Sequence, residues 1–244
     1  MTTPFSEATD RMIASFEAAR EPRAAVAMAK YMRGQFAFLG IASSRRVALE
    51  REAFAGSAKP SADELLSAAR ELWDLPEREF QYAGCGLLSR HAKLLGPSHL
   101  VPVRDFIVTK SWWDTVDTLA AHVVGTMVTA EPDLRLQMDQ WIADDNLWVV
   151  RTALLHQLRF KASTDAGRLF RYCALQAGHR DFFIRKAIGW ALREYSKTDS
   201  NAVRSFVAAH ETELSPLSKR EALLWLNGGR NGASKRNEAS EPEA

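Results

Sequence analysis

The stretches DTLAAHVVG (117–125), RTALLHQLRF (151–160) and RKAIGWALREY (185–195) begin 34 residues apart, and each is apolar with helical spacing. Ala83 lies a further 34 residues before Asp117. A period of this length is typical of stacked helical hairpins, in which each hairpin buries its apolar face on its neighbours. The tetratricopeptide repeat has the same period, but its tryptophan–leucine–glycine–tyrosine pattern is missing. The sequence therefore predicts an all-α, HEAT-like helical-repeat solenoid.

Helix-start signals divide the chain around these repeats. Three serine-x-x-acid pairs fit the capping box that begins a helix: Ser61 with Glu64, Ser111 with Asp114, and Ser218 with Glu221. We expect one helical-repeat domain over residues 1–227. Residues 228–244 are expected to be a disordered tail, because they contain almost no apolar side chains.

Bulk composition excludes several classes of protein. No run approaches the roughly 18 consecutive apolar residues of a membrane helix, and the N-terminus does not resemble a secretory signal. The two cysteines, Cys85 and Cys173, have no spacing that suggests zinc or a disulfide framework, so a cytoplasmic protein is expected. The histidines show no metal pairing, and there is no Walker loop, dinucleotide fingerprint or serine-hydrolase elbow. Nucleotide-dependent and serine-hydrolase mechanisms therefore have no support.

The net charge of +2 is unevenly distributed along the chain. Residues 1–150 carry a balance of −4, residues 151–197 carry +7, and residues 198–244 carry −1. A basic block in a near-neutral chain is typical of a surface that meets phosphates. The alternative is a set of solvated helix faces.

The stretch KSWWDTVDTLA (110–120) is the most informative for chemistry. Trp113 and Asp117 are four residues apart, so they share one helix face. An aromatic ring beside a carboxylate is a plausible site for a cation. Asp114 could serve in place of Asp117, or could complete the Ser111 capping box. The alternative for the tryptophans is core packing.

Further candidates lie on either side of this stretch. Arg151 occupies the repeat position of Asp117 and would suit a phosphate, or alternatively a salt bridge to Asp144 or Asp145. Trp190, five residues after Arg185, could contact a base or sugar, or pack between repeats. Near the start, Tyr31, Arg33, Phe36 and Phe38 interleave aromatic and basic side chains, as a nucleic-acid surface or a capping helix would.

Together these stretches resemble the DNA alkylation repair family, the alkylpurine DNA glycosylases of the AlkD type. Six segments carry the resemblance in the same order: YMRGQFAFLGI (31–41), ELWDLPEREFQ (71–81), VTKSWWDTVD (108–117), DDNLWVVRTALLHQLRFK (144–161), DFFIRKAIGWALREYSKT (181–198) and LSPLSKREAL (214–223). The resemblance implies a solenoid that holds duplex DNA on a concave face. It also implies excision of positively charged N3- and N7-alkylated purines without metal or cofactor and without base flipping.

The resemblance assigns roles to individual residues. Trp113 and Trp190 match the family's two site tryptophans, and Asp117 matches its catalytic carboxylate. Arg151 matches an arginine that supports the site and binds the DNA backbone, and Tyr31 matches a tyrosine at the edge of the site. Such a site would suit an alkylated purine, because the leaving base is already cationic and the developing sugar cation needs a fixed anion.

Other positions are less closely matched. Arg185 and Lys186, beside Trp190, are expected DNA contacts. Some relatives have glutamine where this chain has Ala42, which puts a DNA contact at that position in doubt. The expected partner is duplex DNA containing alkylated purines, with no membrane and no nucleotide cofactor, and the chain is expected to be a monomer. Two other classes stay open, a non-catalytic binder of damaged or bent DNA and a HEAT-type protein-interaction scaffold.

Overall fold

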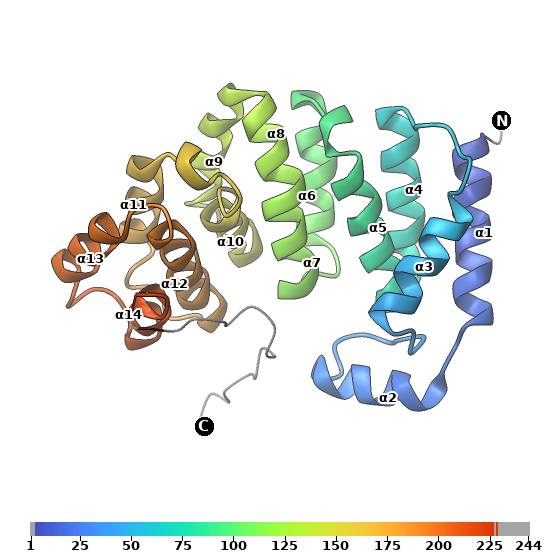
Figure 1. Cartoon of the computed structure of the whole chain (residues 1–244), viewed down its shortest axis with the longest axis horizontal. Coiled ribbons are helices and arrows are strands. Elements are labelled where there is room, and N and C mark those ends of the chain that lie inside the picture. Colours follow the sequence, from blue (N-terminus) through green and yellow to red (C-terminus); the bar gives the residue numbers. More distant parts are fainter. Residues whose placement is uncertain (1–2, 227, 229–244) are drawn as a thin grey trace. The chain divides into compact units, whose positions relative to one another are not determined.

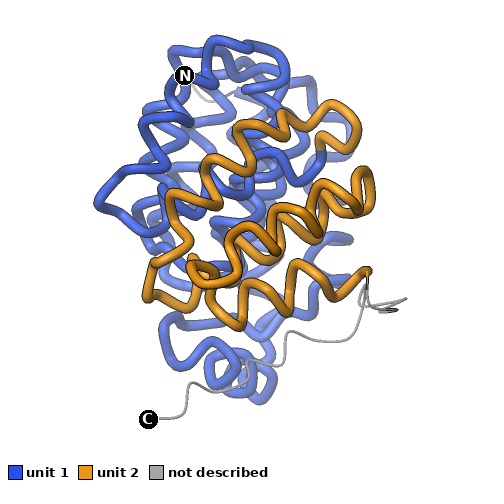
Figure 2. The backbone as a smooth tube through the Cα atoms, turned by 90° about the vertical axis from the view of Figure 1, so that its left-hand side faces the viewer, with its two compact units in different colours: residues 1–159 blue, residues 160–244 orange. Residues whose placement is uncertain are grey.

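The computed structural model describes residues 3–226 and 228, and the secondary structure of these residues is helical throughout. No β-strand occurs among them, apart from one isolated bridge. The chain forms two compact units, residues 1–159 and residues 160–244, which Figure 2 shows in different colours. The prediction of an all-α, helical-repeat fold is confirmed.

The first unit consists of short helices in successive antiparallel hairpins (Figure 1). Its elements are α1 (Pro4–Ala18), α2 (Pro22–Tyr31), α3 (Ser43–Ala53), α4 (Ala62–Asp74), α5 (Arg78–Arg90), η1 (Ala92–Leu94), η2 (Pro97–His99), α6 (Leu100–Val108), α7 (Trp113–Thr118), η3 (Leu119–Val124), α8 (Gly125–Ala130), η4 (Pro132–Leu134), α9 (Arg135–Trp141) and α10 (Leu147–Leu155). Helix α4 packs against α5, α5 against α7, and α7 against α10. Consecutive hairpins therefore bury their apolar faces on one another, as the 34-residue period predicts.

The second unit continues the same pattern. Its elements are η5 (Lys161–Ser163), α11 (Ala166–Leu175), α12 (Phe182–Ser196), α13 (Ser200–Ala209) and α14 (Pro216–Leu223). Helix α12 packs against both α13 and α14. No helix among the described residues is long and apolar enough to cross a membrane. The tail expected over 228–244 lies outside the described residues, except for Gly228.

The predicted helix starts are right in one case out of the three. Ser61 caps α4 in a capping box with Glu64, as expected. The box at Ser218 and Glu221 is wrong, because Ser215 is the residue that caps α14 and Ser218 accordingly lies inside the first turn. Ser215 accepts a hydrogen bond from the backbone of Ser218, which is the bond a helix cap makes.

The capping box at Ser111 and Asp114 is also wrong. The N-cap of α7 is Trp112, which has extended backbone and makes no side-chain cap hydrogen bond. Ser111 Oγ donates to the carbonyl of Ile107 at the end of α6 instead. Lys110 has a left-handed backbone, with φ of 49°, and this turns the chain before α7 begins. Helix α7 therefore starts without the serine cap that the sequence suggests.

Helix α7 runs directly into a π-helix, η3, and then into α8. The π-helix begins two residues after Asp117. At its end, Gly125 lies so close to α10 that a Cβ atom there would be 2.3 Å from the carbonyl oxygen of His156. Since π-helical turns are rare and occur often at functional sites, this feature draws attention to the residues just before it.

Candidate functional site

The carboxylate of Asp117 and the guanidinium of Arg151 form a two-pronged ion pair between α7 and α10. Arg151 Nε donates to Asp117 Oδ1 at 2.7 Å, and Nη2 donates to Oδ2 at 2.8 Å. The side chain of Arg151 is 3% exposed and that of Asp117 is 13% exposed. The pair therefore lies at the edge of the first unit's core, and the carboxylate is its more accessible member.

The repeat geometry explains this pairing. Asp117 and Arg151 occupy equivalent positions of adjacent repeats, and packed helices lie about 8–10 Å apart, a gap that an arginine side chain spans. Asn146 caps α10 by accepting from the backbone of Trp148, which fixes where the helix that carries Arg151 begins. Asp144, one of the two partners expected from the sequence, pairs with Arg104 at 2.8 Å instead.

Burial and the charge of Arg151 shift the pKa of Asp117 in opposite directions. Removal from water raises the pKa of the Asp117 carboxyl above its ordinary value, because burial penalises the charged form. The charge and hydrogen bonds of Arg151 lower this pKa, while the nearby carboxylate of Asp114 raises it. Asp117 is thus a largely buried but still accessible acid whose anionic form is stabilised by one arginine, and perturbed acids of this kind are frequent in functional sites.

Three tryptophans lie at the starts of α7 and α10. Trp113, the first residue of α7, is half-buried and is one turn before Asp117. The rings of Trp112 and Trp148 are packed together, with centroids 5.8 Å apart and planes at 52°. Sequence reasoning did not single out Trp148, although it is three residues before Arg151 and so shares a helix face with it. The structure thus places more aromatic surface near the ion pair than the sequence suggested.

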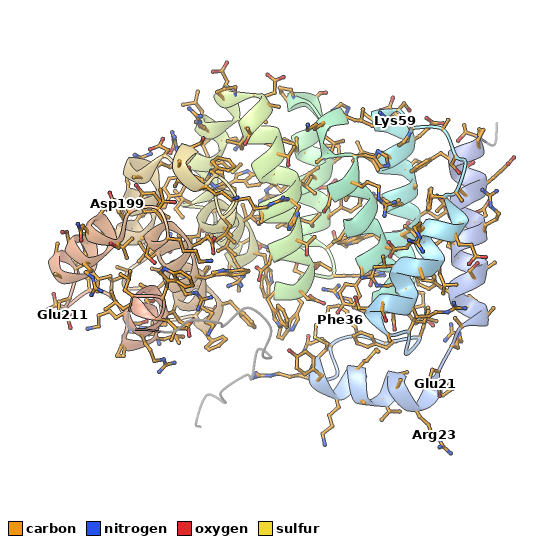
Figure 3. All side chains as sticks on the ribbon, in the orientation of Figure 1. Glu21, Arg23, Phe36, Lys59, Asp199 and Glu211 are labelled. Carbon is orange, nitrogen blue, oxygen red and sulfur yellow. The ribbon has the colours of Figure 1, made fainter. Side chains whose placement is uncertain are left out.

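Tyr31 lies at the end of α2, a helix with no buried residue. Its side chain is 57% exposed, and that of Val26 on the same helix is 72% exposed. Figure 3 shows Arg23 of α2 pointing away from the rest of the unit. Tyr31 is therefore largely at the surface of the first unit, and its place at the edge of a site stays a prediction.

Glu79 and Arg78, at the start of α5, fix the segment that follows α2. The buried Glu79 carboxylate accepts from three successive backbone N–H groups, those of Leu39 (2.9 Å), Gly40 (2.8 Å) and Ile41 (3.1 Å). The centroid of the Phe36 ring lies 3.7 Å from the Arg78 guanidinium carbon. The aromatic and basic interleaving predicted near the chain start therefore includes an internal contact, since Phe36 covers a buried arginine.

Trp190, Arg185 and Lys186 belong to the second unit. Trp190 is half-buried on α12 and follows Gly189, where a Cβ atom would lie 2.4 Å from the Cβ of Glu221 on α14. Lys186 Nζ is 2.8 Å from Glu221 Oε1, and Arg185 Nε donates to the carbonyl of His179 at 2.8 Å. Both basic residues expected to contact DNA thus also have partners within their own unit.

The basic block of residues 151–197 contains ion-paired side chains, exposed side chains and side chains that are both. Five of its members form ion pairs in the described chain: Arg151 with Asp117, Arg168 with Asp165, Lys186 and Arg193 with Glu221, and Lys197 with Glu194. Four others are exposed: Arg159, Lys161, Arg171 and Arg180. Asp165 and Glu194 are already counted in the +7 balance, so these pairs bring in only two acids from outside the block, Asp117 and Glu221, and leave a balance of +5. Within the described residues, no group of three or more His, Cys, Asp or Glu side chains could hold a metal ion.

Comparison with known proteins shows which family the chain belongs to. The family model described as DNA alkylation repair enzyme matches residues 12–226. A solved structure, described as a predicted DNA alkylation repair enzyme from Enterococcus faecalis, is 30% identical with a TM-score of 0.79, and the match covers 86% of this chain and 97% of that one. A search of curated proteins found no match. The chain belongs to the DNA alkylation repair enzyme family.

Proposed function

We propose that this protein is a monofunctional alkylpurine DNA glycosylase. It hydrolyses the bond between deoxyribose C1′ and a purine that carries a positive charge because it is alkylated at N3 or N7. The family's role in repair of alkylated DNA supports this proposal. The observation that carries it is the partly exposed Asp117 carboxylate, held by two hydrogen bonds from Arg151.

The proposed reaction needs an anion more than an acid. When the C1′–N bond breaks, its electron pair leaves with the alkylated purine, which becomes neutral without being protonated. The sugar becomes an oxocarbenium-like cation, and a water oxygen adds to C1′ and loses a proton. A carboxylate fixed beside C1′ stabilises that cation and can accept or direct the water proton. The products are a free purine base and an abasic site.

Arg151 supports this chemistry by orienting the Asp117 carboxylate and favouring its anionic form. Trp113 lies one turn earlier on the same helix and offers a ring face to the cationic nucleotide. Family resemblance alone supports the roles of Trp190 as a second site tryptophan and of Tyr31 at the edge of the site. The proposed DNA contacts of Arg185 and Lys186 rest on their basic charge beside Trp190, and the resemblance supports a reaction without base flipping.

A non-catalytic DNA binder is the second candidate. The observation that favours a binder is the burial of Arg151, because a buried arginine paired with an aspartate can also be a purely structural ion pair. Such a protein would bind alkylated duplex DNA, with an affinity that falls steeply as salt rises, and would release no base.

The deciding experiment measures release of 7-methylguanine and 3-methyladenine from methylated duplex DNA by chromatography. The parent protein is expected to release both faster than spontaneous depurination. Asp117→Asn is expected to lower the single-turnover rate by about 100-fold or more. Asp144→Asn, which removes a carboxylate from a different arginine of the same unit, is the matched control and should retain the parent rate. Release at the parent rate by Asp117→Asn would remove Asp117 from the mechanism, and no release by the parent would favour the binder.

A further inference from the structure

A second arginine–aspartate pair lies on the other side of α7 from Arg151. Arg78, at the start of α5, is fully buried, and the Asp114 side chain is 8% exposed. Arg78 Nε donates to Asp114 Oδ2 at 3.0 Å, and Nη2 donates to Oδ1 at 2.6 Å. Asp114 was expected either to replace Asp117 or to complete a serine cap. The structure assigns its carboxylate to Arg78 instead.

Arg78 also contacts the chain on both sides of Asp114. Its Nη1 donates to the carbonyl of Lys110 at 2.8 Å, and its Nη2 donates to the hydroxyl of Thr115 at 2.9 Å. The ring of Phe36 covers the guanidinium. A single arginine thus binds the residue before the turn into α7 and two residues of the first helical turn.

The start of α7 needs such support because it has no conventional cap. Its N-cap residue, Trp112, supplies no side-chain acceptor, and Lys110 before it has a left-handed backbone. The Lys110 ammonium group donates to the carbonyls of Trp73 and Leu75, at 2.6 and 2.7 Å, which ties the same turn to the end of α4. Arg78 and Lys110 only donate hydrogen bonds, so they do not replace the acceptor of a helix cap; they fix this turn by bonds to neighbouring oxygen atoms instead.

We propose that Arg78 and Asp114 are positioning residues, whose forked ion pair fixes the first turn of α7 and thereby the placement of Trp113 and Asp117. Trp113 is adjacent to Asp114, and Asp117 is one turn further along. Helix α7 is therefore held by two arginines, Arg78 from α5 and Arg151 from α10.

Energetics argue against a purely stabilising role for this pair. Replacing a buried ion pair by well-packed apolar residues is often neutral or stabilising, so stability alone does not explain a fully buried arginine. A forked arginine–carboxylate pair, in contrast, fixes the orientation of the carboxylate as well as its distance from the arginine. The reason is that two parallel hydrogen bonds define the plane of the carboxylate. A displacement of about 1 Å at a reacting group can cost about 100-fold in rate, so rigid placement has a direct catalytic value.

The pair also acts electrostatically on Asp117. The negative charge of Asp114 raises the pKa of Asp117, whereas Arg151 lowers it. Asp114 in turn faces Arg78 and the hydroxyl of Tyr82, both on α5; burial, and after it the Asp114 carboxylate, raises the pKa of Tyr82 above its usual range. Replacing Asp114 by asparagine removes one negative charge near Asp117 and leaves the Arg78 cation uncompensated. Loss of the Asp114 charge favours the Asp117 anion.

The test compares the full-length parent with Arg78→Lys and Asp114→Asn. The control is Arg104→Lys, which changes another arginine–aspartate pair of the same unit that does not involve α7. Two measurements are made, the pH dependence of single-turnover base release and the pKa of Asp117 by carboxyl ¹³C NMR. Binding of methylated duplex DNA and thermal unfolding are recorded for every variant, and rates are taken where all variants are folded.

Arg78→Lys keeps the charge but loses the fork. It is expected to lower the release rate about tenfold or more, with nearly unchanged DNA affinity. Asp114→Asn is expected to lower the pKa of Asp117 and to move the acidic limb of the rate profile to lower pH by the same amount. Arg104→Lys should change neither the release rate nor the pKa of Asp117. If Arg78→Lys does not fold, the titration of Asp117 in Asp114→Asn carries the test.

The rate measurements rest on the proposed function, but the NMR titration does not. A parent protein that releases no base would overturn the proposed function, and the Asp117 pKa of Asp114→Asn would still report on the coupling. If both variants only lower the melting temperature, while the release rate per folded molecule and the Asp117 pKa stay at parent values, the pair is structural and the proposal is wrong.

Discussion

Arg151 binds the Asp117 carboxylate through two parallel hydrogen bonds of 2.7 and 2.8 Å, and this relationship governs how the acid titrates. Burial raises the pKa of Asp117 above its ordinary value, and Arg151 limits the rise. The working form is the anion, which exists above the pKa. Base release should therefore fall as pH decreases through a value higher than about 4, the ordinary aspartate pKa.

Arg151→Gln tests whether Arg151 lowers the pKa of Asp117. Loss of the cation removes a contribution that lowers the pKa of Asp117, so the acidic limb of the rate profile should move to higher pH. The measurement is single-turnover base release across a pH series, with Arg104→Gln as the control. A limb that moves to lower pH, or not at all, would contradict the assignment of the limb to Asp117.

Removal of Asp117 should also cost stability, because it leaves Arg151 buried without its counter-ion. Asp117→Asn is expected to lower the free energy of unfolding by about 3 kcal/mol. The exposed pair Arg70 and Asp105, with side chains 43% and 50% exposed, gives a matched comparison. Asp105→Asn should change the free energy by less than about 1 kcal/mol. Urea unfolding of both variants measures the difference.

Gly40 should be irreplaceable in the segment bound by Glu79. It has φ of 92°, and a Cβ atom there would lie 2.1 Å from the carbonyl oxygen of Glu21. Gly34 has φ of 69° but no atom within 4 Å of such a Cβ. Gly34→Ala is expected to cost about 1 kcal/mol of unfolding free energy from backbone strain alone, and Gly40→Ala clearly more. Equal melting temperatures for the two variants would contradict the clash.

In the second unit, Gly189 allows α12 and α14 to approach closely. A Cβ atom at Gly189 would lie 2.4 Å from the Cβ of Glu221 and 2.9 Å from the carbonyl oxygen of Ser218. Gly189→Ala should therefore separate the helices, at a cost of about 1–3 kcal/mol. The fluorescence of the neighbouring Trp190 should change as well. Gly178→Ala, where a Cβ would meet nothing within 4 Å, is the control.

The helical-repeat fold could be predicted because its signal is local and periodic. Apolar spacing within each segment and the 34-residue step between Asp117 and Arg151 were sufficient. The same step also implied that these two side chains are neighbours in adjacent repeats. Sequence reasoning instead assigned Arg151 to a phosphate or to nearby acids, because it looked for partners close in sequence.

The parts of the site that escaped prediction depend on non-local contacts or on unusual backbone. Arg78 meets Asp114 across 36 residues, and no local pattern signals that contact. The serine cap at Ser111 failed for a different reason, since the left-handed turn at Lys110 moves the start of the helix to Trp113. Propensity favours serine at a helix start, but here tertiary bonds decide where the helix begins.

The π-helix from Leu119 to Val124 adds a consequence for how this family member could diversify. A π turn accommodates one surplus residue within an α-helix, and one residue corresponds to about 100° of rotation around the helix axis. Deleting a single residue, for example Ala121, would let the helix return to regular winding. Because the π turn absorbs the surplus residue locally, the helix on either side would keep its facing, and Asp117 would still face α10. The π segment is therefore a place where one residue can be gained or lost while the residues before and after it stay in register.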